Sequence, residues 1–84
     1  MEFIELDTLS DFEYLESGDI LVVKWSDYTV KHKQNIQKVQ TYNIVEHKKD
    51  RYEIICKMPE NHYFNYLHFI NHKSGADEVY KVII

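Results

Sequence analysis

The strongest constraint on the fold is the run Ile20 to Trp25, in which four consecutive apolar residues precede a lysine and a tryptophan. Side chains of this kind favour the pleated surface of a strand over a helix. Turn-forming residues flank the run at Gly18-Asp19 and at Ser26-Asp27. The run therefore predicts a central strand, and its successive apolar positions predict burial on both faces. It does not decide whether Trp25 lies in the core or on the surface.

Other segments favour strands for the same reason, since Tyr supplies 7 of the 84 residues whereas Gly and Pro supply only 2 and 1. Residues 39–45 and 51–58 predict a hairpin around the polar loop 46–50. Residues 78–84 predict a final strand after a turn at 71–75. Two shorter strand predictions complete the set: an edge strand over Phe3, Ile4 and Leu6, and an extension of the central strand over residues 28–31.

The segment before the central strand predicts one short helix. Thr8 can cap its start, with Asp11 three residues later as a variant of the capping box. Gly18 can adopt the left-handed conformation that ends many helices. At helical spacing, one face would carry Leu9, Phe12 and Leu15.

Residues 62–70 fit two interpretations. Their aromatic and asparagine content favours a strand that follows a turn at 59–61. Tyr63, Tyr66, Leu67 and Ile70 also match helical spacing, and Pro59 could open a helix. We favour the strand and keep the helix as the alternative.

Together these segments predict a mainly β fold with one short helix, arranged as a small antiparallel, partly open barrel of about five strands. We expect residues 1–84 to form a single domain, because a chain this short cannot bury two cores. The entry through residues 15–19 into a β-branched strand resembles the start of SH3-like barrels.

The N-terminal segment carries acids where a signal peptide needs basic residues, and no apolar run reaches the length of a membrane span. We therefore expect a cytoplasmic protein with no membrane partner. The single cysteine, Cys56, cannot form an internal disulfide, which agrees with a reducing compartment.

The sequence offers little for catalysis. Cys56 shares strand parity with Tyr52 and Ile54, so we expect a buried and unreactive thiol. Neither a nucleophile elbow nor a glycine-rich phosphate loop is present in the sequence. We expect no enzyme activity, no catalytic residue and no cofactor.

The five histidines do not predict a metal site. His68 and His72 have the spacing of two ligands on one helix face, but the strand interpretation removes that helix. On a strand, His62 and His68 would lie about 20 Å apart at 3.3 Å per residue. His47, between Glu46 and Lys48, is expected in an exposed loop.

Charge is distributed unevenly along the chain, with a net −7 over residues 1–19, +4 over 20–57 and −1 over the remainder. An acidic face can steer association with a basic partner. Our leading hypothesis is therefore a non-catalytic protein-binding module, an acidic inhibitor or regulator of a host or neighbouring protein, as in bacterial or phage accessory proteins. The residues predicted to bind this partner are Glu5, Asp7, Asp11, Glu13, Tyr14 and Glu16.

The alternative hypothesis is a small barrel that binds single-stranded nucleic acid. Cations alternate with aromatic rings within fifteen residues, as they do in proteins that stack unpaired bases. The net charge of −4 argues against this class, because nucleic-acid binders are usually basic. The residues concerned are Lys24, Trp25, Tyr28, Lys31, His32, Lys33 and Lys38.

The sequence leaves the oligomeric state open. The final strand, which ends in Ile83-Ile84, could pair with a second copy if it lies at a sheet edge.

Overall fold

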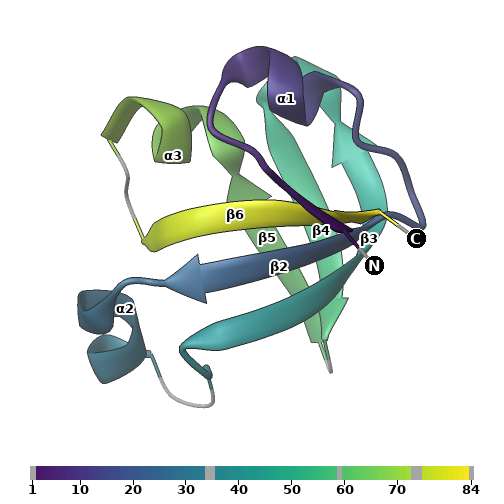
Figure 1. The fold of residues 1–84 in the computed structure, drawn as a ribbon. Coiled ribbons are helices and arrows are strands. Elements are labelled where there is room, and N and C mark those ends of the chain that lie inside the picture. Colours follow the sequence, from purple (N-terminus) through teal and green to yellow (C-terminus); the bar gives the residue numbers. More distant parts are fainter. Residues whose placement is uncertain (1, 34–35, 59, 73–74, 84) are drawn as a thin grey trace.

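The computed structural model describes residues 2–33, 36–58, 60–72 and 75–83. Six antiparallel strands form one open sheet in the order β1-β6-β2-β3-β4-β5 (Figure 1). The mainly β prediction is therefore confirmed, with three short α-helices where one was expected. The elements are β1 (Glu2–Glu5), α1 (Leu9–Glu13), β2 (Ile20–Trp25), α2 (Asp27–His32), β3 (Val39–Lys48), the 3₁₀ helix η1 (Lys49–Arg51), β4 (Glu53–Met58), β5 (Glu60–Asn65), α3 (Tyr66–His72) and β6 (Ala76–Ile83).

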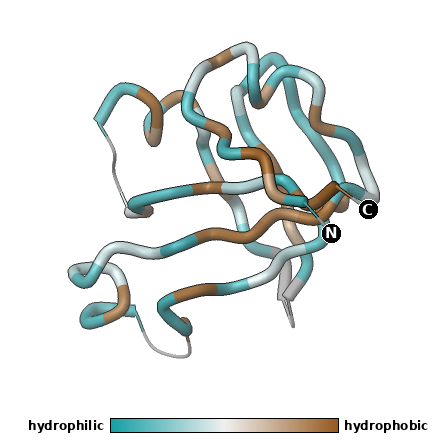
Figure 2. Tube along the Cα trace, in the orientation of Figure 1, coloured by the Kyte–Doolittle hydropathy of each residue, from teal (hydrophilic) through white to brown (hydrophobic). Residues whose placement is uncertain are grey.

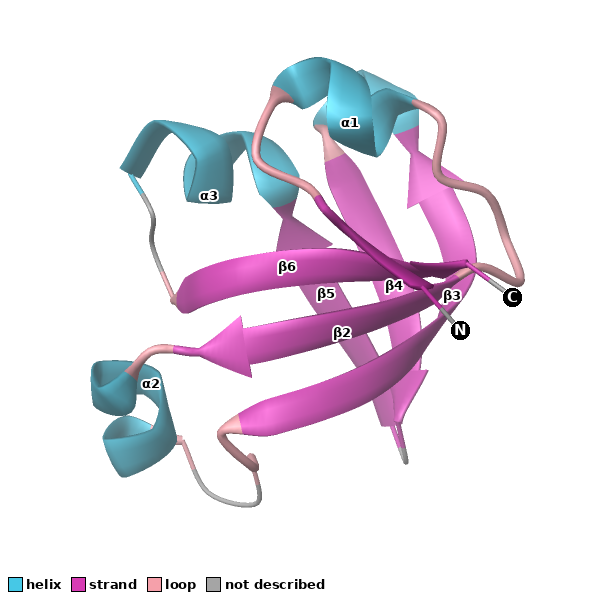
Figure 3. Ribbon diagram, in the orientation of Figure 1, coloured by secondary structure: helices cyan, strands magenta, loops and turns pink. Residues whose placement is uncertain are grey.

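The sheet curls because β3 is long and kinked. Its first half pairs with β2 and its second half with β4, and the register shifts between Ile44 and Glu46. Such a bulge bends a strand and increases its twist. The strands β4 and β5 consequently cross behind β2 and β6 in Figure 3, while β1 and β5 remain as the two edges.

The concave side of the curled sheet holds an aromatic core. Trp25 on β2 lies edge-on to Tyr42 on β3 and to Phe64 on β5, with ring centroids 6.2 and 6.3 Å apart. The Trp25 indole N–H donates to the Tyr42 hydroxyl at 3.2 Å, which satisfies both buried polar groups. Trp25 is only 6% exposed, so it is a core residue.

The helix α1 forms where it was predicted. Thr8 caps it, and the Asp11 carboxylate accepts the Thr8 backbone N–H, which completes the capping box. Phe12 is fully buried and stacks on Tyr66 of α3 at 5.0 Å. The predicted helical face is formed only in part, because Leu9 is 42% exposed on α1 and Leu15 lies beyond the end of the helix.

The end of α1 also differs from the prediction. The helix stops at Glu13, before Gly18 is reached. Gly18 does adopt a positive φ of 95°, but in the turn that enters β2, where its N–H donates to the Ile44 carbonyl at 2.8 Å.

The extension of β2 over residues 28–31 was wrong, because these residues belong to α2. The Ser26 hydroxyl accepts the Thr29 N–H and caps this helix. The Thr29 hydroxyl donates to the Gly75 carbonyl at 2.7 Å. This contact with the residue before β6 holds α2 in place, and a local strand pattern cannot reveal it.

Residues 62–70 combine both interpretations, since β5 continues to Asn65 and α3 begins at Tyr66. The Asn65 side-chain oxygen accepts the His68 N–H at 2.8 Å and so caps the first turn of α3. The helix α3 runs to His72, into the predicted turn at 71–75, and residues 73–74 lie outside the described part of the chain.

The residues of the predicted loop 46–50 lie in a strand and a 3₁₀ helix instead. The strand β3 extends to Lys48, and η1 and Tyr52 make the connection to β4. Tyr52 adopts a left-handed conformation with φ 53°.

Candidate functional site

The predicted acidic residues lie on β1, on α1 and in the loops beside them. Glu5, Asp7, Glu13 and Glu16 are exposed, and Tyr14 is 75% exposed. We call these five residues the acidic rim.

Asp11 differs from the other predicted acids because it has a structural role. Its carboxylate accepts the backbone N–H groups of Asp7 and Thr8, both at 3.0 Å. These two hydrogen bonds hold the pKa of Asp11 below its ordinary value. Asp11 therefore stabilises the start of α1.

A second feature was missed by the sequence analysis: the convex face of β1, β6 and β2, which Glu5 of the acidic rim borders. Residues directly opposite each other in antiparallel strands share a face, which groups Phe3 with Val82 and Tyr80 with Val22. By alternation, Ile20 lies on the same face. We call these five residues the outer apolar face.

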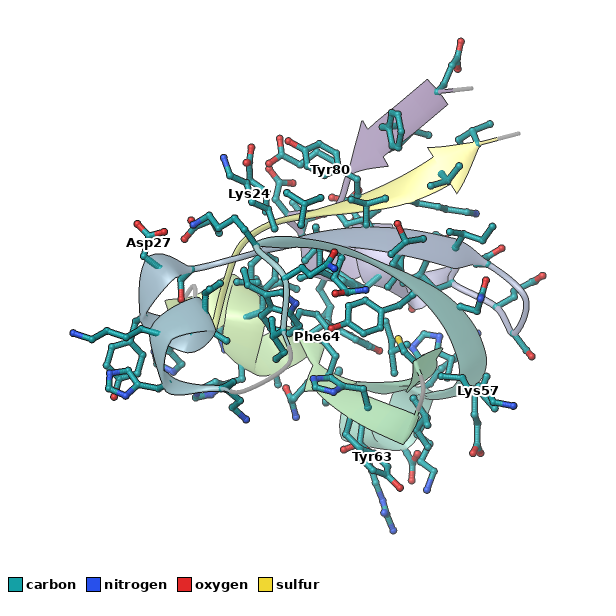
Figure 4. The ribbon with its side chains drawn as sticks, turned by 90° about the horizontal axis from the view of Figure 1, so that it is seen from below. Lys24, Asp27, Lys57, Tyr63, Phe64 and Tyr80 are labelled. Atoms are coloured by element: carbon teal, nitrogen blue, oxygen red, sulfur yellow. The ribbon has the colours of Figure 1, made fainter. Side chains whose placement is uncertain are left out.

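The outer apolar face is only partly covered by the described part of the chain. Phe3 is 55% exposed, and Ile20, Val22, Tyr80 and Val82 are half-buried. Figure 2 shows the hydrophobic stretches of β1, β2 and β6 side by side near the termini. In Figure 4, Tyr80 and Lys24 lie on the opposite side of these strands from Phe64, which belongs to the core.

The expected burial of Ile20 to Val23 on both faces was therefore wrong. Leu21 and Val23 are buried in the core, whereas Ile20 and Val22 alternate with them on the convex face. The signal that could have revealed this face was already in the sequence. Apolar residues at outward positions of a strand indicate either a second core layer or a binding surface.

A polar network borders the outer apolar face. Lys24 Nζ lies 3.2 Å from Glu78 Oε2, and the Tyr80 hydroxyl donates to Glu78 Oε1 at 2.7 Å. This hydrogen bond raises the pKa of Tyr80 to about 12.

The seven residues predicted to bind nucleic acid do not form one surface. Trp25 is in the core, Lys24 pairs with Glu78, and Lys38 lies 2.7 Å from Asp27. The ion pair with Asp27 raises the pKa of Lys38 and lowers that of Asp27. The four residues that remain exposed all lie on or beside α2: Tyr28, Lys31, His32 and Lys33.

A cavity of about 450 Å³ opens between α2, β5 and the end of β2. Trp25 and Phe64 contribute to its wall from the core, and Tyr28 and Lys33 contribute from α2 and its C-cap. His62 lines the same wall, with its ring 5.8 Å from that of Trp25. Burial, together with the nearby Lys33 cation, lowers the pKa of His62, so its imidazole is neutral at neutral pH.

His47 is not in an exposed loop as expected. It lies near the end of β3, where its Nδ1 is 2.8 Å from the Leu15 carbonyl oxygen and its Nε2 is 2.8 Å from the Tyr66 hydroxyl. These two hydrogen bonds connect β3 to the loop after α1 and to α3. His47 is therefore a structural residue.

His68 and His72 do lie on a helix, α3, contrary to the strand interpretation, and their rings are 4.9 Å apart. Two histidines make an incomplete metal site. Within the described ranges, no group of three or more His, Cys, Asp or Glu residues could hold an ion. Cys56 is buried in β4, and burial raises its thiol pKa to about 11.

The condition for pairing of the final strand with a second copy is not met. The strand β6 lies inside the sheet, between β1 and β2. The available edges belong to β1 and β5.

None of the helices in the described ranges is long and apolar enough to cross a membrane. Comparisons with protein-family models, with curated proteins and with solved structures found no match. The class defined here is thus a small, mainly β domain with one curled antiparallel sheet.

Proposed function

We propose that this chain is a non-catalytic protein-binding module that docks its partner on the outer apolar face, with the acidic rim steering the approach. The observation that carries the proposal is the exposure of Phe3 beside the half-buried Ile20, Val22, Tyr80 and Val82 on three paired strands. Contiguous apolar surface with a polar border is typical of interaction sites.

The charge of the rim supports a partner with basic residues. Glu5 lies directly opposite Tyr80, at the border of the apolar face, and Asp7 follows two residues later. Exposed acids at the rim would raise the association rate with a basic surface, whereas the apolar centre would supply most of the affinity.

The same charges disfavour a second copy as the partner. If the free edges of two β1 strands paired antiparallel about a point between Phe3 and Ile4, each Glu2 would lie opposite the Glu5 of the other copy. Like charges directly opposite each other destabilise a strand pair. A different protein that presents an apolar segment flanked by Lys or Arg fits the edge and the face better.

Site-specific photo-crosslinking tests this proposal. A photoreactive phenylalanine replaces Phe3 in one variant and Tyr63 in a control, since Tyr63 is 61% exposed on β5 and lies away from Tyr80 (Figure 4). We expect a defined crosslinked protein at position 3 and none at position 63. That protein should be lost when Val22 is replaced by Asp, and its yield should fall when the salt concentration is raised.

Two results would refute the proposal. One is equal crosslinking from both positions, which indicates nonspecific contact. The other is a crosslinked partner whose yield is unchanged in a Glu5→Lys, Glu13→Lys, Glu16→Lys variant, because the acidic rim would then have no role. Circular dichroism of each variant, compared with the parent, separates lost binding from lost folding.

The second candidate function is binding of nucleic acid through α2. It is favoured by the four exposed residues Tyr28, Lys31, His32 and Lys33 beside the cavity. It is disfavoured by the ion pairs that neutralise Lys24 and Lys38. A footprint of so few cations predicts a shallow dependence of binding on salt.

A further inference from the structure

We infer that the cavity between α2 and β5 binds a single nucleotide, with the base against its aromatic wall and the phosphate at Lys33. This site is separate from the outer apolar face and goes beyond the protein-binding role. Its volume of about 450 Å³ lies within the range of small-molecule pockets.

The wall of the cavity is aromatic and firmly supported. Trp25 and Phe64 are both buried core residues, with ring centroids 6.3 Å apart. Tyr28 lines the cavity from α2 and is 73% exposed, and its ring lies 4.3 Å from that of His32 on the same helix. The exposed Tyr28 ring can stack on a base of any kind, whereas the buried Trp25 and Phe64 rings only line the wall.

The helix that carries Tyr28 is fixed to the rest of the fold. Thr29 donates its hydroxyl proton to the Gly75 carbonyl at 2.7 Å, and the Ser26 N–H donates to the same carbonyl at 3.0 Å. Lys38 also holds Asp27 at the start of α2 at 2.7 Å. The two sides of the cavity are therefore held in place before any ligand enters, which lowers the entropy cost of binding.

The charge of the cavity selects an anion. Although the protein has 14 acidic residues, none of the described residues that line the cavity is acidic. Lys33 supplies a positive charge at the rim. The His62 imidazole can donate one hydrogen bond and accept another, as the edge of a base requires. An aromatic wall, one cation and a neutral imidazole together match a planar heteroaromatic ring with an attached phosphate.

A nucleotide could reach this site free in solution or as part of a single strand. Trp25 is the only tryptophan in the sequence, so its fluorescence reports occupancy directly. The experiment titrates the full chain with each nucleoside monophosphate, with a homopolymeric oligodeoxynucleotide and with inorganic phosphate. We expect the nucleotides to quench Trp25 and phosphate alone to have no effect.

Two pairs of variants locate the binding. Lys33→Gln should weaken mononucleotide binding about tenfold, which corresponds to about 1.4 kcal/mol. Lys31→Gln on the same helix should leave it unchanged, because Lys31 does not line the cavity. Tyr28→Ala should weaken binding by a similar factor through lost stacking, whereas the equally exposed Tyr14→Ala should not.

The outcomes separate the sources of the nucleotide. Quenching by mononucleotides that depends on Lys33 but not on Lys31 supports a free nucleotide. Quenching by the oligonucleotide alone, weakened in both lysine variants, supports a nucleotide within a strand. The inference is overturned if no nucleotide quenches Trp25, if phosphate alone has the full effect, or if Lys33→Gln and Tyr28→Ala bind like the parent.

Discussion

Replacement of Phe12 by Ala should destabilise the protein more than any exposed substitution in α1. This helix spans five residues, too few to be stable in water by itself. Phe12 fastens it to the core, since its buried ring lies 5.0 Å from Tyr66, 6.0 Å from Phe69 and 6.3 Å from Phe64.

The expected magnitude follows from this burial. Truncation of a buried Phe to Ala costs about 3–5 kcal/mol. A domain of this size has a total stability of roughly 4–13 kcal/mol. Phe12→Ala should therefore remove a large part of the free energy of unfolding, and Phe12→Leu, which keeps most of the volume, should remove less.

Urea denaturation followed by Trp25 fluorescence measures these differences. Trp25 is buried in the same core, so its emission reports global unfolding. The control is Tyr14→Ala, which removes an exposed aromatic residue two positions later and should change stability by less than about 0.5 kcal/mol. A Phe12→Leu variant as stable as the parent, with Phe12→Ala within about 1 kcal/mol of it, would refute the role of Phe12 as the anchor of α1.

Three further predictions concern acid stability, thiol reactivity and backbone strain. The pKa of Asp11 is lowered in the folded state, so its stabilising contribution is present above the ordinary value of 3.8 and is lost as the pH falls through the folded pKa. Asp11→Asn should therefore reduce the free energy of unfolding at neutral pH and make that free energy decline less steeply in acid. The control variant, Asp7→Asn, should show neither effect. The Cys56 thiol, with its pKa of about 11, should react with a disulfide reagent at neutral pH only after the protein unfolds, and rapid reaction of the folded protein would contradict its burial. Gly18→Ala should lower the free energy of unfolding by about 1–2 kcal/mol, because an alanine is strained at φ 95°. The added Cβ would meet no atom within 4 Å, so a steric clash would not contribute. An unchanged midpoint in urea would show that the turn relaxes.

The elements that the sequence predicts well are those decided by nearby residues. The strand Ile20–Trp25 and the capping box of Thr8 and Asp11 both depend on contacts or preferences within a few positions. The errors fall where distant residues decide the structure. Residues 28–31 form a helix that is tied to Gly75, and His47 is half-buried because Leu15 and Tyr66 bind both ring nitrogens.

The candidate sites show the same division. The charges of Glu5 and Glu16 could be read directly, and both are exposed. The sequence does not reveal the partners that neutralise Lys24 and Lys38. Glu78 approaches Lys24 only in the folded sheet, and Asp27 approaches Lys38 only at the start of α2. The outer apolar face also depends on strand order, since Phe3 and Val22 lie on strands that both pair with β6.

The position of β6 in the sheet sets an order of events during synthesis. The first strand of the chain, β1, pairs with β6, and β6 also forms one side of β2. Strand pairs so distant in sequence form slowly, because the entropy cost of closing a long loop comes before any stabilising contact forms. On the ribosome, β1 therefore emerges long before residues 76–83 can pair with it. A nascent chain halted before those residues would expose the side of β2 that β6 covers, which makes this stage the one at which a chaperone or a second chain would most readily bind.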